Sequence, residues 1–226
     1  MNLLFLTSGS GKIFEYIFKD KIISTKKIYL YGDLKAGCKK IANKKGIKIL
    51  GTFKKKLNSD ILLEICKKYK IDYLLLYSFT HMLKGKLLKK YKNRIFNSHH
   101  SLLPAFPGKY YKDQLRQKYG SRKIFERCVD YGLNLTGNTI HVVDENLDGG
   151  QPIIQSILVF DNNSKKHSRN ELFKHEYKSL KQFIIWLKRK KVVLKYTKID
   201  KKKKFIIKGG KYKLSEKNPF VPNLDY

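Results

Sequence analysis

The chain has 226 residues, of which 42% are hydrophobic, which is enough for one domain with a packed core and at most a small appendage. No run of about 18 apolar residues occurs, which excludes a transmembrane helix, and the N-terminal apolar segment resembles a buried strand more than a signal peptide. The three scattered cysteines include no Cys-x-x-Cys pair, so we expect no disulfide framework, no metal site and a cytoplasmic location.

The formal net charge of +32 is compatible with a nucleic-acid or membrane partner, although we expect no membrane partner. Lysine supplies most of this charge, whereas recognition of phosphates and bases favours the planar fork of arginine. Lysine is abundant together with isoleucine, tyrosine and asparagine, which indicates a bias of composition. We therefore expect no specific nucleic-acid partner, and a positive field that attracts an anionic small molecule.

The first half of the chain alternates short apolar runs with helix-type patterns. Expected strands cover residues 3–6, 28–31, 47–50 and 73–77. Expected helices cover residues 34–43 and 83–91, with a third helix between them that is capped by Asn58 or Ser59 and carries Ile61, Leu62, Ile65 and Cys66 on one side. The alternation predicts an α/β fold, a doubly wound and mostly parallel sheet whose ligands lie beyond the carboxyl ends of the strands.

A glycine-rich turn joins the first strand to the first helix through Gly9, Ser10, Gly11 and Lys12. Free backbone N–H groups at a helix start favour an anion. The turn is therefore either a substrate-binding anion site or a plain tight turn.

The second half carries the polar blocks. A strand that begins at residue 95 delivers Asn97 and His99, and strands at 139–143 and 152–158 flank a loop that contains Asp148. Between the strand that begins at residue 95 and the strand at 139–143, we interpret the basic, tyrosine-bearing stretch 109–120 as an insertion. It is either a solvent-exposed loop or a surface that contacts a specific acceptor. A helix follows at 123–129.

A polar linker at 162–167 precedes a long amphipathic helix over residues 170–190. Glu176 shares its apolar stripe with Leu172, Leu180, Ile184 and Leu187, and a carboxylate on an apolar face needs a partner. From Lys201 the tail predicts a short β-hairpin around Gly209 and Gly210. We divide the chain into a catalytic domain, residues 1–195, and a basic hairpin tail, residues 196–226.

Several blocks occur in a characteristic order: Asn97-Ser98-His99, Ser101 to Pro104, Thr136 to His141, and Asp148 to Gly150. Together they resemble the folate-dependent formyltransferases, most closely the glycinamide ribonucleotide formyltransferases of purine synthesis. The resemblance covers roughly residues 1 to 195 and implies a Rossmann-like fold. It also implies 10-formyltetrahydrofolate as the formyl donor, without a metal, and an anionic amine as the acceptor.

The resemblance implies a role for each matching residue. Asn97 would stabilise the oxyanion by donating its amide N–H. His99 would stabilise the oxyanion when protonated and would assist the movement of the proton. Asp148 would hold His99 and raise its pKa, directly or through an ordered water. Folate would lie along residues 79–83 and 143–148, which include Phe79, His81, Met82, Leu83, Val143, Asp144 and Glu145. Glu176 would bind the acceptor's amine.

Two departures leave the acceptor open. The first loop lacks the hydroxyl and amide side chains that the glycinamide enzymes carry after Gly11. His100 stands where those enzymes have proline, and a His-His pair resembles the formyltetrahydrofolate deformylases. Sugar-nucleotide N-formyltransferases, a deformylase and a basic RNA-binding module are the alternatives, and a monomer or homodimer is expected.

Overall fold

The structure is a computed structural model that describes residues 1–53, 57–106, 124–159, 165–190, 192–196, 203–207, 214–215 and 218–222. Contacts within the chain define two compact units. The first unit comprises Met1–Ser98 and Val142–Asn146, and the second comprises His99–His141 and Leu147–Tyr226. The insertion expected at residues 109–120 lies outside the described residues.

The first unit is built on a parallel sheet. Its strands are β1 (Leu3–Thr7), β2 (Ile28–Gly32), β3 (Lys48–Thr52), β4 (Tyr73–Tyr77) and β5 (Ile95–His99), and β5 ends at the first residue of the second unit. Each neighbouring pair among these strands is parallel. The connections contain the helices α1 (Lys12–Lys19), α2 (Ala36–Lys45), α3 (Ser59–Lys68), α4 (Lys86–Lys90) and the short 3-10 turn η1 (Thr25–Lys27).

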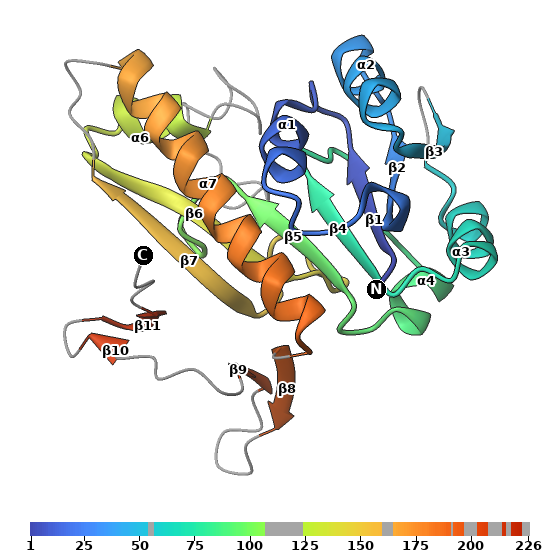
Figure 1. The fold of residues 1–226 in the computed structure, drawn as a ribbon. Helices are drawn as coiled ribbons and strands as arrows, with labels where there is room; N and C mark the ends of the chain where they lie inside the picture. Colours follow the sequence, from blue (N-terminus) through green and yellow to red (C-terminus); the bar gives the residue numbers. More distant parts are fainter. Residues whose placement is uncertain are drawn as a thin grey trace. The chain divides into compact units, whose positions relative to one another are not determined.

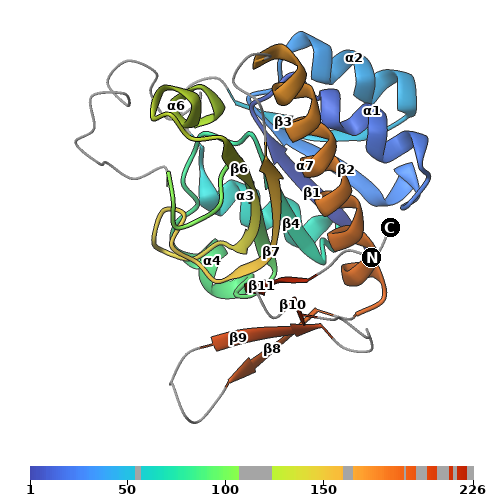
Figure 2. The same cartoon turned by 90° about the vertical axis from the view of Figure 1, so that its left-hand side faces the viewer.

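Both faces of this sheet are covered by helices, as Figure 2 shows for β1 and β4. Leu4 and Leu6 of β1 belong to a buried cluster that includes Leu62 of α3 and Leu87 of α4. Alternate residues of a strand face opposite sides, and Phe5 meets Phe14 of α1 edge-on with ring centroids 5.0 Å apart. The doubly wound arrangement expected from the sequence is therefore confirmed.

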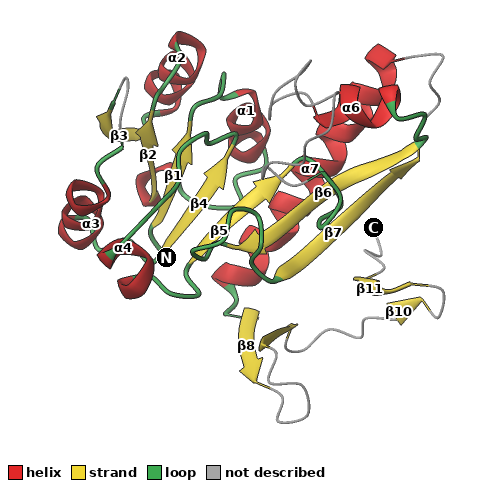
Figure 3. Cartoon of the chain, turned by 180° about the vertical axis from the view of Figure 1, so that it is seen from behind, coloured by secondary structure: helices red, strands yellow, loops and turns green. Residues whose placement is uncertain are grey.

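The second unit contains the antiparallel strands β6 (Leu135–Val142) and β7 (Pro152–Val159) together with α6 (Ile124–Asp130) and α7 (Lys165–Lys188) (Figure 3). Helix α7 packs on β7 (Figure 1). Cys128, Leu158 and Leu172 join α6, β7 and α7 in one small core. Within the first unit the strand order is β3-β2-β1-β4-β5 and the neighbouring strands are parallel, whereas β6 and β7 of the second unit are antiparallel.

Three local expectations need correction. Ile61 is 55% exposed, and Leu63 takes its place in the core, so the buried face of α3 is rotated from the expected one. Helix α4 begins only at Lys86, because Gly85 precedes it with a positive φ of 66°. Helix α7 begins at Lys165, inside the segment expected to be a polar linker.

The C-terminal segment contains two small antiparallel pairs. β8 (Val192–Tyr196) pairs with β9 (Lys203–Ile207), and β10 (Leu214–Ser215) pairs with β11 (Asn218–Pro222) (Figure 2). Phe205 lies opposite Leu194, so the hairpin predicted around Gly209 and Gly210 is shifted: the strand that contains Phe205 pairs with the preceding strand.

Candidate active site

Strand β5 carries the first two predicted catalytic residues. Ile95 and Phe96 are buried, and they anchor the strand in the core. Asn97 is half-buried and lies in register opposite Leu76 of β4. Since alternate residues of a strand project to the same side, Asn97 and His99 share one face of β5.

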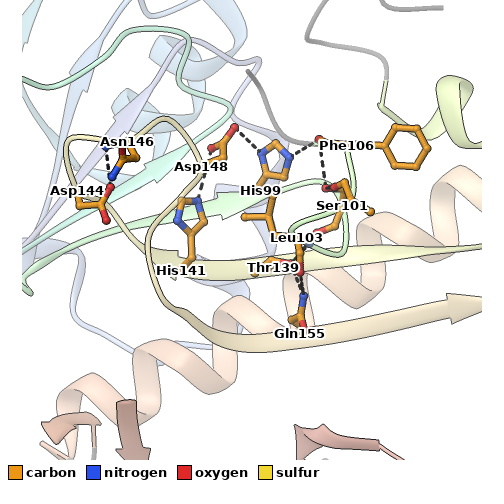
Figure 4. Close-up of polar contacts among 11 residues, drawn as sticks. His99, Ser101, Leu103, Phe106, Thr139, His141, Asp144, Asn146, Asp148 and Gln155 are labelled. Carbon is orange, nitrogen blue, oxygen red and sulfur yellow. Dashed lines mark hydrogen bonds and ion pairs between the residues drawn. The ribbon is translucent and has the colours of Figure 1, made fainter. Parts of the chain in front are cut away.

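His99 is buried and has an acceptor at each ring nitrogen (Figure 4). Its Nε2 atom donates to the backbone carbonyl of Phe106 at 3.0 Å, and its Nδ1 atom lies 3.6 Å from Oδ2 of Asp148. The direct pairing with Asp148 agrees with the sequence-based prediction. Only the imidazolium form carries an N–H toward both acceptors at once.

The pKa of His99 departs from the expected direction. Burial lowers it from the ordinary value of 6.5, while the Asp148 carboxylate and the Phe106 carbonyl act in the opposite sense. We expected Asp148 to raise this pKa and His99 to be protonated. Loss of hydration outweighs the carboxylate because the ring is almost fully enclosed, so the resting imidazole is neutral near pH 7.

His141 is a site residue to which the sequence assigned no role. It is buried in β6, and its Nε2 atom lies 3.6 Å from Oδ1 of Asp148. The two imidazoles therefore flank a single carboxylate, and Figure 4 shows Asp148 between them. Asp148 has a positive φ of 52° and a side chain that is 8% exposed. The Thr-x-His alternation in the motif was the available signal, because it places His141 on the same face as Thr139.

The segment that supplies the Phe106 carbonyl is fixed by hydrogen bonds from β6 and β7. The Thr139 hydroxyl donates to the carbonyl of Ser101 at 2.7 Å and accepts from the amide of Leu103 at 2.9 Å. Gln155 donates to the carbonyl of Leu103 at 2.8 Å. Ser101 closes the turn by donating to the carbonyl of Ala105 at 2.6 Å. These contacts position the acceptor that holds Nε2 of His99.

Glu176 occupies the buried stripe of α7, as the sequence predicted, and its partner is His100. The Nδ1 atom of His100 is hydrogen-bonded to Oε1 of Glu176. The Glu176 side chain is 5% exposed and the His100 side chain is 33% exposed. Glu176 raises the pKa of His100 above 6.5 against the opposing effect of burial. The carboxylate thus favours the protonated form of His100.

The two segments predicted to bind folate meet at one apolar cluster of the first unit. Phe79 and Val143 pack against the cluster that contains Leu83, which is 3% exposed. His81 meets Phe53 edge-on with ring centroids 4.7 Å apart.

The remaining residues of these segments are more accessible. Met82 is 46% exposed and Glu145 is exposed, while the Asp144 carboxylate accepts from the amide of Asn146 at 2.7 Å. Their contact with folate stays a prediction.

The glycine-rich turn precedes α1, as expected. Ser10 and Lys12 are exposed at the start of the helix. The Gly9 amide donates to the Thr7 hydroxyl at 3.1 Å, so one expected anion donor is already engaged. A Cβ atom at Gly11 would lie 2.8 Å from Cα of Cys38, so glycine there permits the close approach of α2. Binding of an anion by this turn stays a prediction.

The part of the chain that the structure describes holds no cluster of His, Cys, Asp and Glu side chains suited to a metal ion. Among its helices, none combines the length and apolarity needed to cross a membrane.

Known proteins resemble this chain in sequence and in fold. Residues 1–184 match the family described as "Formyl transferase". A chloroplastic phosphoribosylglycinamide formyltransferase of Vigna unguiculata is 30% identical over 169 residues, which cover 69% of this chain and 50% of the relative. A mitochondrial formyltetrahydrofolate deformylase 1 of Arabidopsis thaliana is 35% identical over 109 residues, which cover 48% of this chain and 29% of the relative. The chain spans half or less of the length of these curated relatives.

Solved structures share the fold. The phosphoribosylglycinamide formyltransferase of Anaplasma phagocytophilum has a TM-score of 0.74 at 20% identity and covers 93% of this chain and 96% of its own. Glycinamide ribonucleotide transformylase 1 of Symbiobacterium toebii has a TM-score of 0.72 at 20% identity and covers 91% and 94%. A formyltetrahydrofolate deformylase of Pseudomonas syringae has a TM-score of 0.68 at 18% identity and covers 91% and 64%. At these identities the likeness establishes the architecture.

Proposed function

The chain belongs to the formyl transferase family, and we propose that it transfers a formyl group from 10-formyltetrahydrofolate to a primary amine. The observation that carries the proposal is the enclosed His99, with the Asp148 carboxylate facing Nδ1 and the Phe106 carbonyl at Nε2. This arrangement suits a base that takes up one proton and is stabilised once it carries it.

In the proposed reaction one carbon–nitrogen bond forms and another breaks. The amine nitrogen attacks the formyl carbon, and a tetrahedral oxyanion forms that the side-chain amide of Asn97 stabilises by donating a hydrogen bond. Neutral His99 takes the proton that the attacking nitrogen loses. The bond from the formyl carbon to N10 of the folate then breaks, and the proton passes to N10.

We propose an anionic acceptor that resembles phosphoribosylglycinamide, the substrate that the relatives' names imply. The net charge of +32 supports an anion, and the exposed Lys12 at the start of α1 supports a place for its phosphate. Lys12→Ala should raise the KM of the acceptor and leave the KM of the folate unchanged. Lys19→Ala, at the other end of the same helix, is the matched control and should change neither KM.

Hydrolysis of the formyl donor is a second candidate, because the His100 pair occupies the carboxylate that an acceptor amine would use. The deformylase relatives favour the same alternative. In a deformylase the nucleophile would be water, and Asn97, His99 and Asp148 would keep the same roles.

Release of tetrahydrofolate from 10-formyltetrahydrofolate distinguishes these candidates. Three reactions are compared: one with phosphoribosylglycinamide, one with an amino sugar nucleotide and one with buffer alone. We expect release only with phosphoribosylglycinamide, and none from the His99→Ala protein. Release of tetrahydrofolate with the amino sugar nucleotide alone would show that the acceptor is an amino sugar nucleotide. Equal release in buffer would establish a deformylase.

A further inference from the structure

His100 and Glu176 form a pair that joins the end of β5 to the buried stripe of α7. The residues are 76 positions apart in the chain, so the pair links two distant segments of the second unit. Glu176 is flanked on its stripe by the buried residues Leu172 and Leu180. An unpaired carboxylate in such surroundings is costly, and His100 supplies the positive charge that compensates it.

The two partners differ in their access to solvent. His100 keeps 33% of its side chain exposed, whereas Glu176 keeps only 5%. The imidazole is therefore the accessible member of the pair, and a ligand that is to reach the carboxylate must move the ring aside. His100 also directly follows His99, so its position is tied to that of the proposed base.

We infer that His100 competes with the acceptor's amino group for Glu176, so that binding of the acceptor displaces His100 and releases its proton. The inference rests on the proposed function, because it requires an amine acceptor. An ammonium group and an imidazolium carry the same charge, and one enclosed carboxylate neutralises one of them. Once separated from Glu176, His100 loses the charge that favours its protonated form, and the proton passes to solvent.

Competition of this kind makes binding of the acceptor depend on pH. In the free protein Glu176 holds the pKa of His100 above 6.5, and in the complex that support is gone. Binding therefore weakens as pH falls from the raised pKa of the free protein toward the lower pKa of the complex. The limiting slope for one released proton is about tenfold in affinity per pH unit.

The charged groups around His100 determine the direction in which pH changes the binding of the acceptor. Glu176 on α7 raises the pKa of His100. His99 on β5 is the neighbouring titratable group, and a charged His100 lowers the pKa of His99. Loss of the proton from His100 consequently removes one positive charge beside the proposed base as the acceptor arrives.

Calorimetry with phosphoribosylglycinamide tests the inference. Binding is measured at one pH near 7 in phosphate and in Tris, whose ionisation enthalpies differ, so that the difference in heat reports the protons released. We expect net release of protons when the unmodified protein binds the acceptor. For His100→Gln, which keeps a neutral hydrogen-bond donor toward Glu176, we expect no release and a weaker dependence of affinity on pH.

A matched variant and a spectroscopic signature complete the test. His175→Gln changes a histidine beside Glu176 in sequence and should leave the proton release unchanged. The ring nitrogen shifts of His100 in the NMR spectrum should change from those of imidazolium to those of neutral imidazole on binding. Thermal unfolding checks that each variant is folded.

The outcomes separate this inference from the proposed function. Binding of phosphoribosylglycinamide by the unmodified protein without proton release, or with equal release from His100→Gln, would overturn the competition while the proposed function stands. Absence of binding by the unmodified protein would contradict the proposed acceptor, and the competition for Glu176 would be rejected with it.

Discussion

The Nε2 atom of His99 donates a hydrogen bond of 3.0 Å to the backbone carbonyl of Phe106. A carbonyl oxygen only accepts, so this contact fixes the proton of neutral His99 on Nε2 and leaves Nδ1 facing Asp148. A second proton taken up at Nδ1 would point at that carboxylate. In this tautomer the ring can accept a proton at Nδ1, where the Asp148 carboxylate compensates the resulting positive charge.

This tautomer predicts how activity responds to acid. Burial holds the pKa of His99 below 6.5, so the base is neutral at pH 7 and becomes protonated in more acidic solution. We expect kcat/KM to fall as pH decreases below 6.5, since kcat/KM reports ionisations of the free enzyme.

Asp148→Asn should lower turnover on the order of a hundredfold. It should also move the fall of kcat/KM in acid, the acid limb of the pH profile, to lower pH, because the carboxylate that raises the pKa of His99 is lost. The measurement is a pH profile of both proteins. A limb that moves to higher pH in Asp148→Asn would contradict the proposed role of Asp148.

The sequence was sufficient to predict the parallel sheet, and the structure brings two of the predicted site residues, His99 and Asp148, together. The run Tyr73–Tyr77 is almost entirely apolar, as a strand covered on both faces must be, and β4 forms there. The face of α3 was harder to predict. Ile61 and Leu63 are both apolar, and the packing of the helix on its neighbours decides which one is buried.

The electrostatics of the site could not be predicted from sequence. The charge of Asp148 suggested a raised pKa for His99, but the enclosure of the ring reverses the direction, and enclosure is a property of the tertiary structure. The position of Glu176 on an apolar stripe showed that a partner was needed. No local pattern indicated that His100, far away in the chain, would be that partner.

Asn97 is predicted to contribute through its side-chain amide alone. Asn97→Ala should lower kcat by about a hundredfold or more, which corresponds to the loss of one oxyanion donor at roughly 3 kcal/mol. The residue is half-buried, so the folded state should persist, and urea unfolding measures this directly. Asn43→Ala, at an exposed position of α2, is the control, and an equal loss of activity in both variants would count against the assignment.

Thr139 is predicted to stabilise the segment that carries the Phe106 carbonyl. Thr139→Val removes the partner of the Leu103 amide and of the Ser101 carbonyl, both at buried contacts, and should reduce the free energy of unfolding by roughly 1–3 kcal/mol. Thr136→Val is the matched change on the same strand. Thr136 makes a weaker contact of 3.4 Å with Cys128, so its loss should be smaller in urea unfolding. Equal losses would show that these backbone contacts do not stabilise the segment.

Gly137 is predicted to be required by the close approach of β7. A Cβ atom there would lie 1.9 Å from the carbonyl oxygen of Ser156, so Gly137→Ala should destabilise the protein by more than the roughly 1–3 kcal/mol typical of overpacking. Gly132→Ala meets open space and experiences only the strain of a positive φ of 73°, worth about 1–2 kcal/mol. Thermal unfolding of the two variants compares these costs, and a smaller loss at Gly137 would be incompatible with this strand geometry.

His141 is predicted to tune His99 through Asp148. Its Nε2 atom lies 3.6 Å from the carboxylate, and its electrostatic effect lowers the pKa of His99. His141→Gln should therefore move the acid limb of kcat/KM to higher pH, opposite to the shift expected for Asp148→Asn. We also expect kcat to fall about tenfold, because Asp148 loses one of the two rings that hold it. A residue that served packing alone would lower stability without moving the limb. The decisive comparison is thus the direction of the shift in the two variants: movement of both limbs in the same direction would show that His141 does not act on His99 electrostatically.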